Sequence, residues 1–431
     1  MKNKTEFCSS RLRERYECII HKSGLPIYVF KKKLSTVYAM YGTRYGSVDS
    51  TFYLDGKAHT VPDGIAHFLE HKLFANEDGS DSFERFSEYG ADANAYTSVN
   101  RTVYLFSCTD RFGDSLRELL CFVNHPHFTE HNVAQERDII AQEIGMYEDS
   151  PAEACYYGML EGLYHTHSVR RNICGTLASI GQITPDLLYD CYHTFYRPDN
   201  MALVVCGDVS TEEILTIADE CLPTDLPPTV ALRQDEAQAE PPHVLQSRVK
   251  KHMQVSKPLF NIGFKDTDIP KDPTARQKKD ACMAILNELI FCRAGQLYNE
   301  LFESGLISPE LTYGYTVTDT FAFNAIAGEA DEPEAVLHRI MAYIEELRSR
   351  PFPTEDFVRA KRVMYAEFVK EFDSAEGIAS NLLGAVFDGY ELFSYLDVLD
   401  SVTEQDVAEA FTHCFAPETL TLSVVYPTTE E

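Results

Sequence analysis

VPDGIAHFLEHKLF, residues 61–74, contains the pattern His-x-x-Glu-His, formed by His67, Glu70 and His71. The stretch has helical spacing, and residues four apart lie on one face of a helix. The two imidazoles can therefore hold one metal ion, with Glu70 on the same side. Two histidines with an oxygen or sulfur donor suit zinc, which keeps one position open for water in a catalytic site. The alternative is an ordinary helix with two surface histidines, and a third ligand would decide against it.

A third ligand has to come from another part of the chain. Residues 136–149, ERDIIAQEIGMYED, have helical spacing and carry Glu136 and Glu143 seven positions apart on one face. Glutamates on such a face are usually solvated. The spacing alone leaves open whether either carboxylate approaches the histidines.

The chain repeats one pattern of helix, turn and strand. Residues 184–208 and 403–427 align without a gap at an offset of 219 (403 − 184). Residues 222–243 contain two proline pairs and interrupt the periodic pattern, as linkers do. We therefore expect two related domains, residues 1–221 and 244–431, joined by a linker over 222–243.

Strand and helix patterns are mixed in both halves. Alternating or continuous apolar residues predict strands, and apolar residues three and four apart predict helices. Strands are expected at 24–32, 37–47, 102–108, 258–265 and 321–330, and helices at 114–126, 136–149, 334–350 and 355–373. The expected fold class is α+β, with helices covering mainly antiparallel sheets.

The amino-acid composition indicates which binding partners and which cellular compartment to expect. The 431 residues include 67 acidic and 38 basic ones, for a net charge of -29. This charge disfavours nucleic acid and anionic membrane surfaces, and it favours basic or neutral peptides. The 12 cysteines are never closer than ten positions, and neither a secretory signal nor an apolar membrane span is recognisable. We expect a cytoplasmic protein with reduced thiols.

Several stretches together resemble the insulinase/pitrilysin family of zinc peptidases, whose members include the β subunit of mitochondrial processing peptidase. The inverted His-x-x-Glu-His motif is followed about seventy residues later by Glu-Arg-x-x-Ile-x-x-Glu. GADANAYTSVNRTVYLF, residues 90–106, is similar to the family's substrate strand, and residues 165–184 resemble its run through Gly-Thr. The similarity covers most of the chain and is greatest to small bacterial processing-peptidase-like proteins. It implies two homologous αβ-roll domains.

The resemblance also implies a function and roles for individual residues. His67, His71 and Glu143 become the zinc ligands, Glu70 the general base and Glu136 a second carboxylate beside the site. Zinc would polarise the scissile carbonyl, while the base removes a proton from water and passes it to the leaving amine. The implied activity is that of a zinc-dependent endopeptidase acting on short or unfolded peptides.

Asn94, Ala95 and Thr97 lie in the strand-like run of residues 92–97. The resemblance implies an exposed sheet edge that binds an extended peptide through backbone hydrogen bonds. An internal strand with a polar face is the alternative that the residues alone leave open.

The second half lacks the metal motif. Adding the offset of 219 to His67 and His71 gives Leu286 and Ile290, which are both apolar. This half is therefore expected to be a non-catalytic repeat that closes over the substrate.

Active family members carry an arginine and a tyrosine in the second half, in a pattern like R-E-x-x-G-L-x-Y, to stabilise the oxyanion. Tyr313 is the expected catalytic tyrosine, with Tyr315 as the alternative. Leu301 stands where the family pattern has the arginine. Arg293, or a group from a partner subunit, could take over the role of that arginine.

The resemblance leaves two functions in competition. The chain is expected to be a peptidase, as a homodimer or as a heterodimer with a related metal-free subunit. The alternative is a non-catalytic or partner-dependent subunit of such an assembly. A third class, the short S-ribosylhomocysteine lyases, shares the motif, but its chain is far shorter and its third ligand is cysteine.

Overall fold

The structure is a computed structural model that describes residues 4–54, 57–224, 231–233, 240–350 and 352–428. The chain forms two compact units, each built from three segments of sequence. The first unit comprises Met1–Ile144, Asn172–Gln234 and Val369–Phe393; the second comprises Gly145–Arg171, Asp235–Phe368 and Ser394–Glu431. The domain boundaries expected at 221 and 244 stay a prediction, and most of the expected linker lies outside the described residues.

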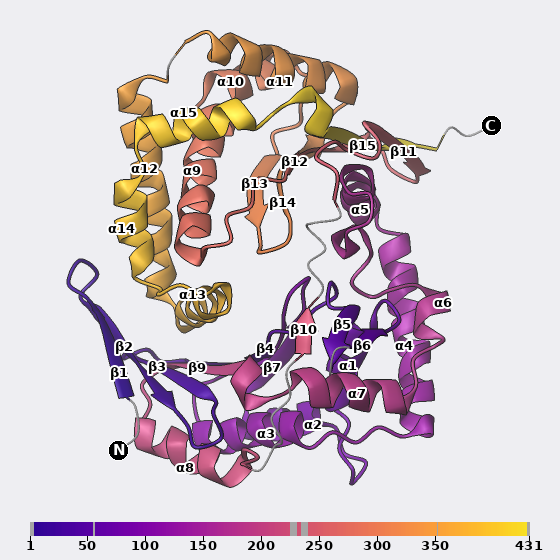
Figure 1. Cartoon of the computed structure of the whole chain (residues 1–431), viewed down its shortest axis with the longest axis vertical. Coiled ribbons are helices and arrows are strands. Elements are labelled where there is room, and N and C mark those ends of the chain that lie inside the picture. The colour runs from indigo at the N-terminus through magenta and orange to yellow at the C-terminus, as the bar shows by residue number, and fades with distance from the viewer. Residues whose placement is uncertain (1–3, 55–56, 225–230, 234–239, 351, 429–431) are drawn as a thin grey trace. The chain divides into compact units, whose positions relative to one another are not determined.

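A seven-stranded sheet in the order β1-β2-β3-β9-β4-β8-β7 forms the centre of the first unit (Figure 1). Its neighbouring strands are antiparallel except for β3 and β9, which are parallel. A small sheet has the order β10-β5-β6. The strands are β1 (Lys4–Ser9), β2 (Glu14–Ile20), β3 (Pro26–Lys31), β4 (Val37–Thr43), β5 (Thr51–Leu54), β6 (Lys57–Thr60), β7 (Asp92–Thr97), β8 (Thr102–Cys108), β9 (Met201–Gly207) and β10 (Ala231–Arg233). Every residue of β9 is buried, which places the core of this unit along the middle of the large sheet.

Helices cover both faces of the seven-stranded sheet. Figure 1 shows α13 on one side of the sheet and α3 with α8 on the other. The helices of this unit are α1 (Ile65–Leu73), α2 (Ser82–Tyr89), α3 (Phe112–Asn124), α4 (Glu130–Glu148, which ends in the second unit), α6 (Leu177–Ile180), α7 (Pro185–Phe195), α8 (Thr211–Cys221) and α13 (Ala375–Asp388). Helix α13 packs on β4 and β9, whereas α1 and α2 pack beside β7. The predicted helix at 136–149 is thus part of the longer α4.

The second unit repeats this design. Its sheet has the order β11-β15-β12-β14-β13, and β11 and β15 form its parallel pair. The strands are β11 (Arg248–Met253), β12 (Leu259–Asp266), β13 (Leu311–Val317), β14 (Ala322–Glu329) and β15 (Leu420–Pro427). The helices are α5 (Pro151–Leu163), α9 (Pro273–Phe291), α10 (Gln296–Glu303), α11 (Pro333–Arg348), α12 (Thr354–Lys370, which ends in the first unit), α14 (Ser394–Ser401) and α15 (Glu404–His413). The predicted α+β class with mainly antiparallel sheets is confirmed.

The two sheets correspond strand by strand. The order β3-β9-β4-β8-β7 matches β11-β15-β12-β14-β13, and the starts of β9 and β15 differ by 219 positions (420 − 201). Thr184 and Thr403 each accept a backbone hydrogen bond at the start of α7 and α15, as the aligned sequences predict. Each unit also takes one helix from the opposite half of the sequence: α13 joins the first unit and α5 the second.

Two further expectations can be compared with the structure. None of the described helices is long and apolar enough to cross a bilayer. All 12 cysteines lie in the described part of the chain, and each is a free thiol.

Candidate metal centre

The start of α1 is fixed by two glycines that bring two loops into backbone contact. Gly64 precedes the helix with φ at +91°, and a Cβ there would lie 2.4 Å from the carbonyl oxygen of Cys174. Gly175 has φ at +74°, and its Cβ would lie 2.4 Å from the carbonyl oxygen of Asp63. Only glycine tolerates this conformation and approach without strain. The contact sets α1 in place one turn before His67.

The structure brings His67, His71 and Glu143 together. Glu143 Oε2, from α4, lies 3.7 Å from His67 Nε2 and 3.6 Å from His71 Nε2. Two ligands held about 2.1 Å from a tetrahedral zinc ion are about 3.4 Å apart, so these distances suit one ion between the three side chains. The buried Oε2 of Glu143 has no hydrogen-bond partner among the described residues, as expected for an atom placed to receive a cation.

Glu136 lies beside this group and orients it. Its carboxylate contacts His71 Nδ1 at 3.1 Å and accepts a hydrogen bond from Lys72 Nζ at 3.1 Å. Burial opposes charge on both His71 and Glu136, but the hydrogen bond between them and the neighbouring charges prevail, so the pKa of His71 is raised and that of Glu136 is lowered. A carboxylate on Nδ1 leaves Nε2 of His71 to face Glu143, the arrangement that orients metal-binding histidines.

His67 is held as a neutral imidazole. The side chain is buried, and burial together with the neighbouring His71 lowers its pKa to about 3. A neutral ring keeps a lone pair for a metal, with no proton to displace at neutral pH.

Glu70 has the properties of a general base. It is only 6% exposed, and its Oε2 accepts a hydrogen bond of 2.8 Å from the hydroxyl of Thr97. Burial is the main cause that raises the pKa of Glu70 to about 7. A carboxyl group that titrates near neutral pH can both take and release a proton.

The expected substrate strand is β7, the terminal strand of its sheet among the described residues. Its exposure alternates: Ala95 and Thr97 are half-buried, whereas Asn94 and Tyr96 are exposed on the opposite face. The strand thus brings Thr97 to Glu70 and directs the side chain of Asn94 away from it. Asn94 Oδ1 instead accepts a hydrogen bond from the backbone N–H of Ala95 at 2.9 Å.

The two candidate tyrosines lie in the second unit, on β13. The hydroxyl of Tyr313 donates to Glu288 Oε2 at 3.0 Å, and Arg359 donates to the other oxygen of Glu288 at 3.3 Å. The hydroxyl of Tyr315 donates to Asp266 Oδ2 at 2.8 Å. Burial and the adjacent carboxylates raise the pKa of both phenols, so both are protonated donors at neutral pH.

Sequence reasoning missed Arg359, a cation that shares the carboxylate of Glu288 with Tyr313. Leu301 is completely buried in the core of the second unit, and Arg293 is exposed after α9. Arg359, from α12, reaches Tyr313 through Glu288. The sequence gives no signal for this contact, because α12 and β13 are about forty residues apart along the chain.

Cys174 is a second residue that sequence reasoning missed. Donor atoms of Cys174, His67 and Glu143 all lie within 4.8 Å of one another, and the cysteine is buried. Its position in the 165–184 stretch, which carries the family resemblance, was the available signal. Cysteine sulfur is a donor that zinc accepts, so this side chain adds to the groups that can hold a metal.

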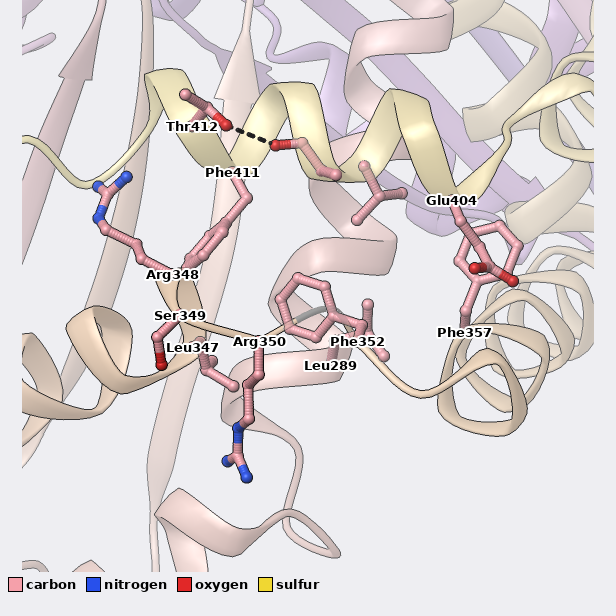
Figure 2. A pocket seen from close by; sticks show the side chains of 12 residues that line it. Leu289, Leu347, Arg348, Ser349, Arg350, Phe352, Phe357, Glu404, Phe411 and Thr412 are labelled. Carbon is pink, nitrogen blue, oxygen red and sulfur yellow. Dashed lines mark hydrogen bonds between the residues drawn. The ribbon is translucent and has the colours of Figure 1, made fainter.

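A separate hollow of about 430 Å³ in the second unit contains none of the expected site residues (Figure 2). Its lining is largely apolar and includes Leu289, Phe352, Phe357 and Phe411. Leu289 occupies the position that the offset of 219 relates to Glu70 (70 + 219). The described residues that line the hollow include no histidine or cysteine, so they lack the nitrogen and sulfur donors found in the first unit.

The chain is similar to known proteins over most of its length. Residues 56–177 match the family "Insulinase (Peptidase family M16)", and residues 182–364 match "Peptidase M16 inactive domain". The chain is 38% identical to the uncharacterized zinc protease YmfH of Bacillus subtilis (strain 168) over 413 residues, which cover 94% of this chain and 95% of the relative.

Solved structures show the same fold. An M16-like peptidase from Alicyclobacillus acidocaldarius superposes with a TM-score of 0.91 at 32% identity, covering 96% of this chain and 98% of that one. A protease from Helicobacter pylori superposes with a TM-score of 0.80 at 17% identity, covering 96% and 100%, which shows the fold alone. Taken with the extended match to YmfH, the chain belongs to the insulinase family of peptidases, M16.

Proposed function

We propose that this protein is a zinc-dependent endopeptidase that hydrolyses short or unfolded peptides. The observation that supports this most directly is the unpartnered Glu143 Oε2, which faces the Nε2 atoms of His67 and His71. These three side chains are the proposed zinc ligands. The relatives named as zinc proteases support the same metal.

Zinc, when bound, supplies a Lewis acid that polarises the scissile carbonyl and makes water more acidic. The remaining steps are proposed for the residues of the chain. Glu70 Oε takes a proton from the attacking water and delivers it to the nitrogen of the leaving amine. Thr97 holds this carboxylate by donating to its Oε2, and Glu136 holds the ring of His71.

We propose that the peptide binds as an added strand along β7, with Asn94, Ala95 and Thr97 supplying the edge. The terminal position of β7 supports this role. Tyr313 is the proposed hydrogen-bond donor to the oxyanion. Arg359 is the proposed source of the positive charge that the family pattern assigns to an arginine at the position of Leu301. The net charge of -29 favours basic peptides.

The proposed catalytic domain is residues 1–221 and the proposed non-catalytic repeat is 244–431. A cytoplasmic homodimer, or a heterodimer with a related metal-free subunit, remains the proposed assembly. The second candidate function is a non-catalytic or partner-dependent subunit. The observation in its favour is Leu301, which is buried where active members are expected to carry an arginine.

The test is digestion of a mixed library of unstructured peptides by the zinc-loaded protein, with new termini read by mass spectrometry. Glu70→Gln should lower the cleavage rate roughly 10²–10⁴-fold and retain bound zinc, because the base is lost and the ligands stay. Glu88→Gln is the matched control, since Glu88 is exposed on α2. A zinc-loaded wild type that cuts nothing would favour the second candidate function.

A further inference from the structure

Two cysteines that are not among the candidate metal ligands lie in contact within the first unit. Cys121 is on α3 and Cys221 is the last residue of α8, and their Sγ atoms are 3.0 Å apart. The two residues are 100 positions apart in sequence. A disulfide bond is about 2.05 Å long, so oxidation requires the sulfurs to approach by about 1 Å. The packing of α3 against α8 thus holds a pair of thiols ready to be linked.

The two sulfurs differ in their access to solvent. Cys121 lines a hollow of about 560 Å³ together with Arg85, His125 and His127. Cys221 is 7% exposed and does not line this hollow. A small molecule entering the hollow therefore meets Cys121 first, with Cys221 behind it.

The surroundings of the pair favour a thiolate on Cys121. The hydrogen bond with Cys221 and the nearby His125 and Arg117 lower the pKa of Cys121 to about 7, against the effects of burial and Glu118. The same hydrogen bond raises the pKa of Cys221. The accessible sulfur is thus the better nucleophile at neutral pH, because the thiolate is the reactive form.

We propose that Cys121 and Cys221 form a reversible intramolecular disulfide, with Cys121 as the attacking thiol and Cys221 as the resolving one. The oxidant is a low-molecular-weight disulfide that enters the hollow. The Cys121 thiolate attacks one of its sulfurs, so that a mixed disulfide forms and one thiolate leaves. Cys221 then gives its proton to the departing thiolate and attacks Cys121 Sγ, which releases the second thiol. Two protein thiols are oxidised and one small disulfide is reduced to two thiols.

The proposed bond would tie α3 to the end of α8 within the first unit. It involves none of the proposed metal ligands and does not depend on the peptidase activity. The oxidation can therefore be tested on the protein whether or not zinc is bound.

The experiment exposes the full chain to glutathione disulfide, blocks the remaining thiols with an alkylating reagent, and maps the cysteines by mass spectrometry. Wild type should yield a Cys121–Cys221 linked peptide, with the thiols of both residues lost. Addition of reduced dithiothreitol should restore both thiols. The proposal is overturned if wild type keeps both thiols, or if glutathione accumulates on Cys121 in wild type.

Two variants separate the roles of the sulfurs. Cys221→Ser should accumulate one glutathione on Cys121, because nothing resolves the mixed disulfide, whereas Cys121→Ser should leave the thiol of Cys221 unmodified. Cys8→Ser is the control, since Cys8 is an exposed free thiol on β1, and it should still form the linked peptide. Modification of Cys221 in Cys121→Ser at the wild-type rate would contradict the assigned order of attack.

Discussion

The two units have equivalent helices and edge strands, but the equivalent helix carries polar residues in the first unit and apolar residues in the second. Helix α1 presents His67, Glu70 and His71 beside β7, whereas α9 has Leu286, Leu289 and Ile290 at the positions 219 residues later. Leu286, Leu289 and Ile290 are all buried in an apolar core.

The neighbouring edge strands differ in the same way. The half-buried positions of β7 include Ala95 and Thr97, but those of β13 include Tyr313 and Tyr315. Small side chains leave room for polar groups beside α1, while large rings and aliphatic residues occupy the related place beside α9. The comparison teaches that one scaffold supports either a polar centre or a packed core, depending on a few inward-facing positions.

The largest expected effect is on stability in the second unit. Leu286→Ala should lower the free energy of unfolding by about 2–5 kcal/mol, because Leu286 is fully buried in apolar packing. In metal-free protein, His67→Ala should cost less than about 2 kcal/mol, because it also removes the buried, unpartnered Nδ1. Urea unfolding of the whole chain measures both, with the exposed Leu177→Ala as control. If Leu286→Ala and His67→Ala lowered the free energy of unfolding equally, the proposed difference between the packed core at α9 and the polar centre at α1 would be wrong.

Glu70 should make the stability of the metal-free protein depend on pH. Its pKa in the folded state is raised to about 7, above its unfolded value near 4.5, so the folded chain binds this proton more tightly. Stability should therefore fall as pH rises from about 4.5 to 7, by about 2–3 kcal/mol for this group. Glu70→Gln cannot ionise and should lack that decline. Unfolding at pH 5 and pH 8 tests this, and a decline in the variant as large as that of wild type would contradict it.

Glu136 sharpens the comparison because the described residues of the second unit include no cluster of possible metal ligands like that of the first. Glu136→Gln should weaken zinc binding roughly 10–100-fold, since His71 loses its charged partner and buried Lys72 loses its counter-ion. Competition with a chromogenic chelator measures the affinity. Glu130→Gln, at the exposed start of the same helix, is the control. Unchanged affinity in Glu136→Gln would show that the carboxylate does not orient the ligand.

The smallest effect concerns Thr97. Thr97→Val removes the hydrogen bond to Glu70 Oε2 and should reduce kcat/KM up to about tenfold. Because that bond stabilises the ionised carboxylate, the acid limb of the pH–rate profile should move to higher pH. Thr97→Ser keeps the hydroxyl and should preserve the profile. A rate loss without a shift of the acid limb would argue for a packing role only.

The sequence predicts what is local or repeated, and it is silent on contacts between distant segments. The helical spacing of residues 61–74 and the offset of 219 are local patterns, so α1, the α+β class and the repeat could be predicted. The approach of Glu143 to the histidines came from the family resemblance, and the structure places it there. Spacing could not identify the bond from Thr97 to Glu70 or the one from Arg359 to Glu288, because tertiary packing creates both.

Each unit contains one helix from the other half of the sequence, α13 in the first unit and α5 in the second, and this affects any attempt to produce the two halves as separate polypeptides. A polypeptide ending near residue 221 would lack α13, and the face of β4 and β9 that this helix covers would meet water. The complementary fragment would lack α5 and expose β12 and β15 in the same way. Each fragment would thus expose a sheet face that is covered in the full chain, and each would carry the helix that the other fragment lacks.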